Sequence, residues 1–301
     1  MPLSGSGSDI DRKGTIMILI TGANGVVGRH VMNVLLEQGV SVGAVTRGAD
    51  GTRLPDNVEA VVGDLARPSW IETALEGAEA IQISPRATGA GLEELLKLAA
   101  ERGVRRVVLL SATTVEYPAG EARFAAQFEH AEDLVARSGL EWTVLRLADF
   151  AANALAWVPQ LKAGDVVRGA YGRAASSPIH ETDIATVAAR ALLGGFPAGS
   201  VYTLTGPRSV DQYEKVRLLG EAVHRPLSFQ ELPPEQVRQA MLAQGLPEEV
   251  PARLLGSLAD YSVHPGPTTT TVEELLGRPA LTFADWARDN APAFQAQPTF
   301  S

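Results

Sequence analysis

Short apolar runs alternate with segments of helical period over residues 15–147. Uninterrupted apolar runs between turn residues are typical of buried strands in a parallel sheet, and a 3.6-residue period is typical of the helices that cover it. The runs predict six strands, at residues 15–20, 40–46, 58–64, 78–84, 105–111 and 141–147. The periodic segments predict helices at residues 26–39, 69–77, 91–103 and 121–138. This order predicts an α/β fold with a doubly wound parallel sheet, the Rossmann arrangement.

The alternation weakens after residue 147. We expect a helix that begins near Glu181 and a strand over residues 200–206. Four further helices are predicted, at residues 231–245, 247–261, 271–277 and 282–290. These patterns predict a nucleotide-binding core over residues 15–150. Residues 151–301 are expected to form mainly a smaller C-terminal substrate lobe, and a segment of about 179–206 is expected to return to the core. The polar residues 1–14 lack the apolar stretch of a signal peptide, and we interpret them as a disordered leader or tag.

Composition narrows the range of partners. Hydrophobic residues make up 45% of the chain and charged residues 20%, which is ordinary for a soluble domain. The net charge of −9 disfavours a nucleic acid as partner. The chain has no cysteine, its histidines lack metal-ligand spacing, and no apolar run reaches the ~20 residues of a membrane span. We therefore expect a cytoplasmic protein with no metal site and no membrane contact; a homodimer is compatible with the sequence.

A glycine-rich turn follows the first predicted strand, in the segment LITGANGVVGRHV. Gly22 permits a tight turn, Gly25 allows close approach of a pyrophosphate, and Gly28 allows the next helix to pack closely on the sheet. The amino end of that helix offers free N–H groups to phosphates. The segment therefore predicts a dinucleotide site. Its predicted members are Gly22, Asn24, Gly25, Val26, Val27 and Gly28.

The second predicted strand ends at Arg47, where an NAD-preferring site usually has a carboxylate for the ribose 2′-hydroxyl. A guanidinium suits a 2′-phosphate, which a carboxylate would repel. The alternative is a solvated surface arginine. We therefore expect NADP(H) to be favoured over NAD(H). Ser84 and Pro85 follow the fourth strand, where the chain is expected to pass the nicotinamide ribose.

The chain resembles the NmrA-like proteins, a group of atypical short-chain dehydrogenases/reductases. The resemblance covers about residues 16–296 and rests on TGANGVVGR, VVGDL, RRVVLLSA, SGLEWTVLRLADFAAN and IHETDIATVAARAL, in this order. It implies a Rossmann core that binds NADP(H) and a small C-terminal substrate lobe. It also implies that Asp64 and Leu65 contact the adenine; the alternative for Asp64 is a turn-forming residue. The group includes quinone and ketone reductases, enzymes of secondary metabolism, and cofactor sensors without turnover.

Reductases of this type carry a Tyr-x-x-x-Lys pair that donates a proton and holds the ribose. The resemblance places Phe124 and Phe128 at these positions, and Ser111 at the position of the serine that holds the carbonyl. A phenyl ring cannot donate a proton, so the usual pair is absent. The phenylalanines are expected to form an aromatic wall of the substrate cavity, or alternatively a buried helix stripe. Phe150 is assigned to the same wall.

Three replacements for the proton donor stay open. Tyr117 can approach from the loop after the fifth strand, or it is a surface tyrosine. His130 lies on a different face of the helix from Phe128, which favours a solvated histidine. An activated acceptor such as a quinone needs no strong acid, and the hydroxyl or amide groups of Ser111, Thr113 and Asn153 can polarise its oxygen. Asn153 matches a cavity position of the group; its alternative is a helix cap.

These observations predict an NADPH-dependent reductase of a quinone-like or aromatic carbonyl compound. Ser111, Tyr117 and Asn153 are its catalytic candidates, and its substrate pocket is expected to include Thr113, Phe124, Phe128, Phe150 and Asn153. The alternative is a non-enzymatic NADP(H)-binding redox sensor that acts through a partner protein. A sugar-nucleotide epimerase is disfavoured because it needs the missing Tyr and Lys. His180 and Asp183 precede a helix and are expected to cap it and support the lobe rather than catalyse.

Overall fold

In the computed structural model, which describes residues 17–48 and 54–295, seven parallel strands form one sheet in the order β3-β2-β1-β4-β5-β6-β8. The strands are β1 (Met17–Thr21), β2 (Ser41–Thr46), β3 (Glu59–Val62), β4 (Ala78–Ile83), β5 (Arg106–Ala112), β6 (Glu141–Leu147) and β8 (Ser200–Leu204). The order reverses direction between β1 and β4, where open α/β sheets bind ligands. The predicted fold class is confirmed. The leader lies outside the described residues.

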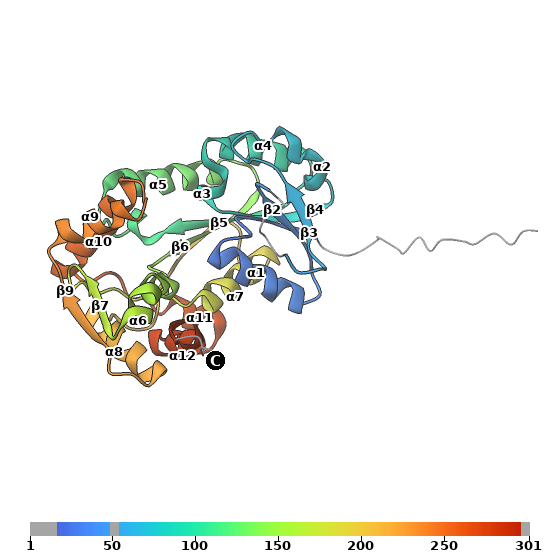
Figure 1. The fold of residues 1–301 in the computed structure, drawn as a ribbon. Coiled ribbons are helices and arrows are strands. Elements are labelled where there is room, and N and C mark those ends of the chain that lie inside the picture. The colour runs from blue at the N-terminus through green and yellow to red at the C-terminus, as the bar shows by residue number, and fades with distance from the viewer. Residues whose placement is uncertain (1–16, 49–53, 296–301) are drawn as a thin grey trace, which may run out of the picture.

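Helices cover both faces of the sheet (Figure 1). On one face, α1 (Val26–Glu37) packs with α7 (Glu181–Leu192). The other face carries α2 (Glu72–Leu75), α4 (Leu92–Glu101) and α5 (Ala122–Ala136). Ile18 and Ile20 enter the core under α1 and α7, while Leu19 between them enters the core under α4 and α5. This alternation explains the continuous apolar runs, since a strand with two covered faces needs apolar residues on both.

The C-terminal region adds a second, mainly helical layer (Figure 1). Its helices are α6 (Val158–Ala163), α8 (Gln212–Val223), α9 (Pro234–Ala243), α10 (Glu249–Val263), α11 (Thr271–Leu276) and α12 (Phe283–Phe294). Of these, α6, α8 and α12 surround a core that includes Leu219, Trp286 and Phe294. A two-stranded parallel sheet of β7 (Val166–Gly169) and β9 (Ser228–Glu231) completes the layer. The short α3 (Pro85–Thr88) follows β4, and 3-10 turns occupy Pro68–Ile71, Gly89–Gly91, Thr113–Val115 and Ala151–Trp157.

The structure differs from the sequence prediction in α8 and in the small sheet, neither of which was expected. The apolar residues Val216, Leu219 and Val223 give α8 a helical period, but charged residues separate them. The strands β7 and β9 are four residues long and mostly exposed, so they lack the apolar run of a buried strand. The core boundary near residue 150 stays a prediction. The segment expected to return to the core contains α7 and β8, which pack on α1 and pair with β6.

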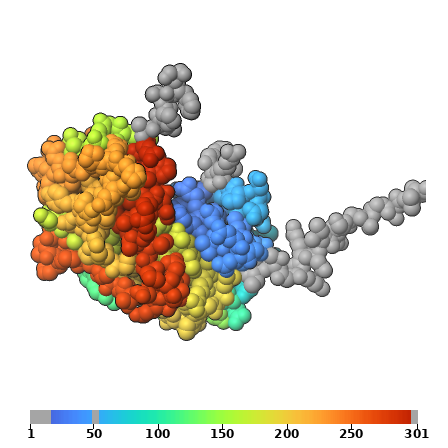
Figure 2. Space-filling view, turned by 90° about the horizontal axis from the view of Figure 1, so that it is seen from below, coloured from blue at the N-terminus to red at the C-terminus, as the bar shows by residue number. Residues whose placement is uncertain are grey.

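Polar contacts at the start of α7 anchor the C-terminal segment. The fully buried carboxylate of Asp183 accepts hydrogen bonds from Arg278 Nη2 at 2.7 Å and from the Leu281 amide at 2.7 Å. His180 caps α7, since its Nδ1 accepts a hydrogen bond from the Thr182 amide at 3.1 Å. The expected structural role of this pair is thus confirmed. Figure 2 shows the C-terminal segment, in red, packed against core segments in blue and yellow. No helix in the described part of the chain is long and apolar enough to cross a bilayer.

Candidate functional site

The turn between β1 and α1 is built for a close ligand. Gly22 adopts φ +66°, a left-handed conformation that favours glycine, and its carbonyl accepts a hydrogen bond from the Gly25 amide at 2.9 Å. A Cβ on Gly28 would lie 2.4 Å from the Gly22 carbonyl oxygen, so only glycine fits there. No side chain caps the amino end of α1. Its first amides therefore remain available to an anion such as a pyrophosphate.

A cavity of about 530 Å³ lies at the carboxyl ends of the strands, next to this turn. That volume is in the usual range for a small-molecule site. Every predicted cofactor residue except Asp64 lines it: Gly22, Asn24, Gly25, Val26, Val27, Gly28, Arg47, Leu65, Ser84 and Pro85. Asp64 is exposed, and its Oδ1 accepts a hydrogen bond from the Ala66 amide at 3.0 Å. This contact matches the turn-forming alternative for Asp64.

Gln82 gives an independent indication that the cavity takes a polar ligand. Its side chain is 1% exposed and lines the cavity, yet neither amide atom has a hydrogen-bond partner among the described residues. A buried amide without partners costs about 1–3 kcal/mol, which a bound ligand can offset. Two features of the cavity thus fit a dinucleotide: the glycine turn after β1 and the unpartnered side-chain amide of Gln82. Sequence reasoning missed Gln82, although a glutamine inside an apolar strand was the available signal.

Arg47 lies at the end of β2 and is exposed at the edge of the cavity. It forms no ion pair with any residue of the described ranges. Thr46, the preceding residue, accepts a hydrogen bond from Asn24 Nδ2 at 3.3 Å, which ties the end of β2 to the glycine turn. The guanidinium of Arg47 therefore lies beside the dinucleotide turn, and no carboxylate of residues 17–48 or 54–295 pairs with it.

Ser111 lines the cofactor cavity at the end of β5 and is engaged in a polar chain. Its hydroxyl donates a hydrogen bond to Glu132 Oε1 at 2.5 Å. Arg146 donates to the same carboxylate, with its Nη2 2.7 Å from Glu132 Oε2. Hydrogen bonding to Glu132 raises the pKa of the Arg146 guanidinium, so this group stays charged. With its hydrogen directed at Glu132, Ser111 presents an oxygen lone pair to the cavity.

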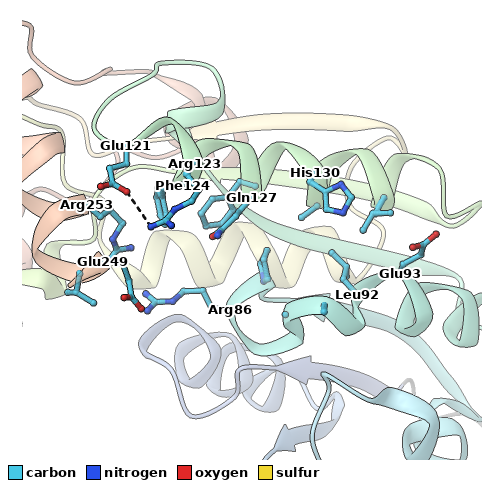
Figure 3. A pocket seen from close by; sticks show the side chains of 17 residues that line it. Arg86, Leu92, Glu93, Glu121, Arg123, Phe124, Gln127, His130, Glu249 and Arg253 are labelled. Atoms are coloured by element: carbon cyan, nitrogen blue, oxygen red, sulfur yellow. Dashed lines mark ion pairs between the residues drawn. The ribbon is translucent and has the colours of Figure 1, made fainter. Parts of the chain in front are cut away.

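A second cavity of about 600 Å³ adjoins the cofactor cavity at Phe128 of α5. Phe124 of the same helix points into this second cavity (Figure 3). The two ring centroids lie 5.0 Å apart in an edge-to-face arrangement. Phe128 lines both cavities, as do Pro85 and Arg86, whereas Phe124 lines the second cavity alone. Phe150 lines the cofactor cavity. Aromatic side chains thus lie where the two cavities adjoin, and their role as a wall of the substrate cavity stays a prediction.

The remaining catalytic and pocket candidates line neither of these cavities. Tyr117 is 41% exposed, and the charge of Glu116 raises its pKa. Asn153 is exposed on a 3-10 turn. Thr113 is buried and hydrogen-bonded to Tyr261, whose pKa burial raises to about 12. These three residues can reach an acceptor beside Phe128 only if the chain rearranges.

His130 is exposed, as expected, and lines the second cavity but not the cofactor cavity. Within the described ranges no group of three His, Asp or Glu side chains is arranged to hold a metal ion.

Comparisons with known proteins agree with this geometry. The model of a family described as NAD(P)H-binding matches residues 22–193. A (4-alkanoyl-5-oxo-2,5-dihydrofuran-3-yl)methyl phosphate reductase from Streptomyces griseus is 34% identical over 279 residues, which cover 92% of this chain and 99% of the relative. An NAD(P)H azoreductase from Xenophilus azovorans is 28% identical, with coverage of 93% and 100%.

Solved structures share the fold. An NADPH-dependent quinone oxidoreductase from Escherichia coli superimposes with a TM-score of 0.74 at 23% identity, over 91% of this chain and 99% of the other. A Citrobacter triphenylmethane reductase gives a TM-score of 0.76 at 18% identity, over 92% and 99%. These likenesses, the family match and the glycine turn confirm the expected resemblance. The chain belongs to the NAD(P)H-binding family.

Proposed function

We propose that the protein is an NADPH-dependent reductase of a quinone-like or aromatic carbonyl compound. The observation that carries this proposal is that the cofactor cavity, next to the glycine turn, adjoins a second, partly aromatic cavity at Phe128. Relatives named as reductases of an azo compound and of a furanone methyl phosphate support it. Both names describe conjugated acceptors, which take up hydride readily. The Streptomyces relative also supports a place in secondary metabolism.

The cofactor would be held by residues from four strand ends. The amides after Gly25 bind the pyrophosphate, and Arg47 binds the 2′-phosphate that distinguishes NADPH from NADH. Leu65 covers the adenine, and the Gln82 amide bonds a polar group of the dinucleotide. Ser84 and Pro85 border the nicotinamide ribose. When bound, the reduced cofactor supplies the hydride.

The protein's own groups position the acceptor rather than protonate it. Phe128 and Phe150 give it an apolar aromatic wall and exclude water from that side. Ser111 accepts a hydrogen bond from a hydroxyl of the nicotinamide ribose, because its own hydrogen goes to Glu132. The oxygen of a reduced quinone is a weak base, so solvent at the open mouth can supply its proton. This arrangement needs no Tyr-Lys pair.

Two measurements made together test the proposal. Calorimetry gives the affinity for NADPH, and absorbance at 340 nm follows its oxidation with quinones, azo compounds, aromatic ketones and enones. We expect tight binding and oxidation with at least one class of acceptor. Tight binding without oxidation by any acceptor would overturn the reductase proposal and favour the NADP(H) sensor. The double variant Phe124→Tyr/Phe128→Lys serves as a comparison. Activity of the wild type equal to or above that of this variant would show that the Tyr-Lys pair is dispensable.

A further inference from the structure

Two arginines, Arg86 and Arg253, line the second cavity, and Figure 3 shows the side chain of Glu249 beside them. Arg86 comes from α3, beside the cofactor cavity, and Arg253 comes from α10 in the C-terminal region. Neither guanidinium lies within 4.0 Å of a carboxylate of the described residues. Burial, and after it the charge of Arg86, lowers the pKa of Arg253. The partly buried guanidinium of Arg253 thus lies under the repulsion of the exposed Arg86.

Contact with an aromatic ring fixes Arg253 in this position. Its guanidinium carbon lies 4.8 Å from the ring centroid of Phe124, a cation–π contact. Phe124 in turn packs edge-to-face on Phe128 at 5.0 Å. A guanidinium held in this way loses little freedom when it binds a ligand. Phe124, which packs on Phe128, therefore sets the position of Arg253.

The acidic residues of the cavity leave these two charges unpaired. Glu121 pairs with Arg123 at 3.6 Å, and Glu93 lies beside His130 at the far end (Figure 3). Glu249 lies on α10, one helical turn before Arg253, and forms no ion pair with either arginine. Asp149 attracts Arg253 from outside the cavity. An anion bound between Arg86 and Arg253 would relieve their repulsion and make charge-assisted, bidentate hydrogen bonds.

The two cavities adjoin at Pro85, Arg86 and Phe128, which line both. A molecule with its reducible group beside Phe128 can therefore extend toward Arg253. We propose that Arg86 and Arg253 form a subsite for a phosphate monoester carried by the acceptor. A phosphate dianion matches two cations, whereas a carboxylate matches one. This inference rests on the proposed function, since it names the class of substrate that the same site takes.

Binding of phenyl phosphate to the NADPH-saturated protein tests the subsite, with benzoate and phenol as the other probes. Calorimetry should show the order phenyl phosphate, benzoate, phenol, and the affinity for phenyl phosphate should fall with added salt. Arg86→Gln and Arg253→Gln should each weaken phenyl phosphate binding about tenfold to a hundredfold. Glu249→Gln should strengthen it, because this change removes a negative charge beside the arginines.

Arg137→Gln is the matched control, because Arg137 is an exposed arginine of α5 outside both cavities and should leave the affinity unchanged. A cooperative urea unfolding transition in each variant shows that it is folded. Equal affinity for phenyl phosphate and phenol, or arginine variants that bind like the wild type, would overturn the subsite. The readout needs no turnover. Binding of phenyl phosphate without NADPH oxidation by any acceptor would support the subsite and contradict the reductase. Oxidation of neutral acceptors with no preference for a phosphate group would support the reductase and contradict the subsite.

Discussion

Ser111 and Glu132 form a short hydrogen bond, with 2.5 Å between the serine oxygen and Glu132 Oε1. The carboxylate is held in turn by Arg146, at 2.7 Å. Because the serine hydrogen is directed into this pair, the cavity side of Ser111 is an acceptor. From the sequence alone, Ser111 could be either a donor that polarises a carbonyl or an acceptor that positions a hydroxyl. The hydrogen bond to Glu132 distinguishes these two roles.

The first prediction follows from the direction of that bond. Ser111→Ala should lower kcat/KM for the best acceptor by less than about tenfold. Loss of a group that stabilises a developing oxyanion lowers kcat by about a hundredfold to a thousandfold instead. Steady-state kinetics at 340 nm distinguish the two cases. A hundredfold loss of kcat with unchanged NADPH affinity would show that Ser111 donates to the acceptor during reaction.

The second prediction concerns the unpartnered amide of Gln82. Gln82→Leu removes a buried polar group that has no partner among the described residues, so the cofactor-free variant should be as stable as the wild type or more stable by about 1 kcal/mol. The same variant should bind NADPH several-fold more weakly. Urea unfolding measures the stability, and calorimetry measures the affinity.

Thr114→Val is the matched control for this pair of readouts. The Thr114 hydroxyl is also buried without a partner, but it lies outside both cavities. We expect the same direction of stability change with no change in NADPH affinity. If Gln82→Leu destabilises the protein and leaves the affinity intact, the amide has a structural role and our assignment is wrong.

The third prediction concerns cofactor choice. Arg47→Ala should weaken NADPH binding about tenfold to a hundredfold, because a charge-assisted hydrogen bond contributes about 1.5–3 kcal/mol. NADH lacks the 2′-phosphate, so its affinity should change little. Competition titrations with both cofactors measure the ratio. Equal losses for NADPH and NADH would show that Arg47 does not contact the 2′-phosphate.

The fourth prediction is a pH dependence in the C-terminal region. The Thr282 hydroxyl accepts a hydrogen bond from the Asp285 amide at 3.1 Å, while the Asp285 carboxylate accepts one from the Thr282 amide at 2.7 Å, a reciprocal cap of α12. Hydrogen bonding to Thr282 lowers the pKa of Asp285. The carboxylate therefore stabilises the fold fully above the ordinary Asp pKa of about 3.9, and this contribution is lost as pH falls through the lowered value.

Asp285→Asn should accordingly lower the free energy of unfolding by about 1 kcal/mol at pH 7. The difference between variant and wild type should shrink as the pH is taken below about 4. Urea unfolding at a series of pH values measures it. Asp133→Asn, in an exposed pair with Arg137, should change stability by less than about 0.5 kcal/mol. A difference for Asp285→Asn that is constant with pH would contradict this account.

Local sequence signals predicted much of the fold and the dinucleotide turn. The run around Ile18 predicts a buried strand because both faces of β1 are covered, and Gly22 and Gly28 predict the turn because the backbone there excludes any Cβ. The strand-end residues Arg47 and Ser84 could be placed for the same reason, since parallel strands all end at one edge of the sheet.

The rest of the site depends on tertiary contacts that sequence cannot supply. The second cavity exists because α10 brings Arg253 onto Phe124, two residues far apart in the chain. The direction of the Ser111 hydrogen bond depends on Glu132 and Arg146, which meet only in the folded protein. Tyr117 and Asn153 were reasonable candidates from their positions in the chain, but the structure places both outside these cavities.

The central claim is that hydride leaves NADPH in a site with Phe124 and Phe128 in place of the Tyr-Lys pair. The most direct test is a single-turnover measurement at 340 nm, with excess enzyme and NADPH deuterated at C4 on one face or the other. We expect a conjugated acceptor to oxidise the NADPH, with a primary isotope effect for one of the two epimers only. NADPH that stays tightly bound and fully reduced with every acceptor would contradict it, and would identify the protein as a binder of the cofactor rather than a reductase.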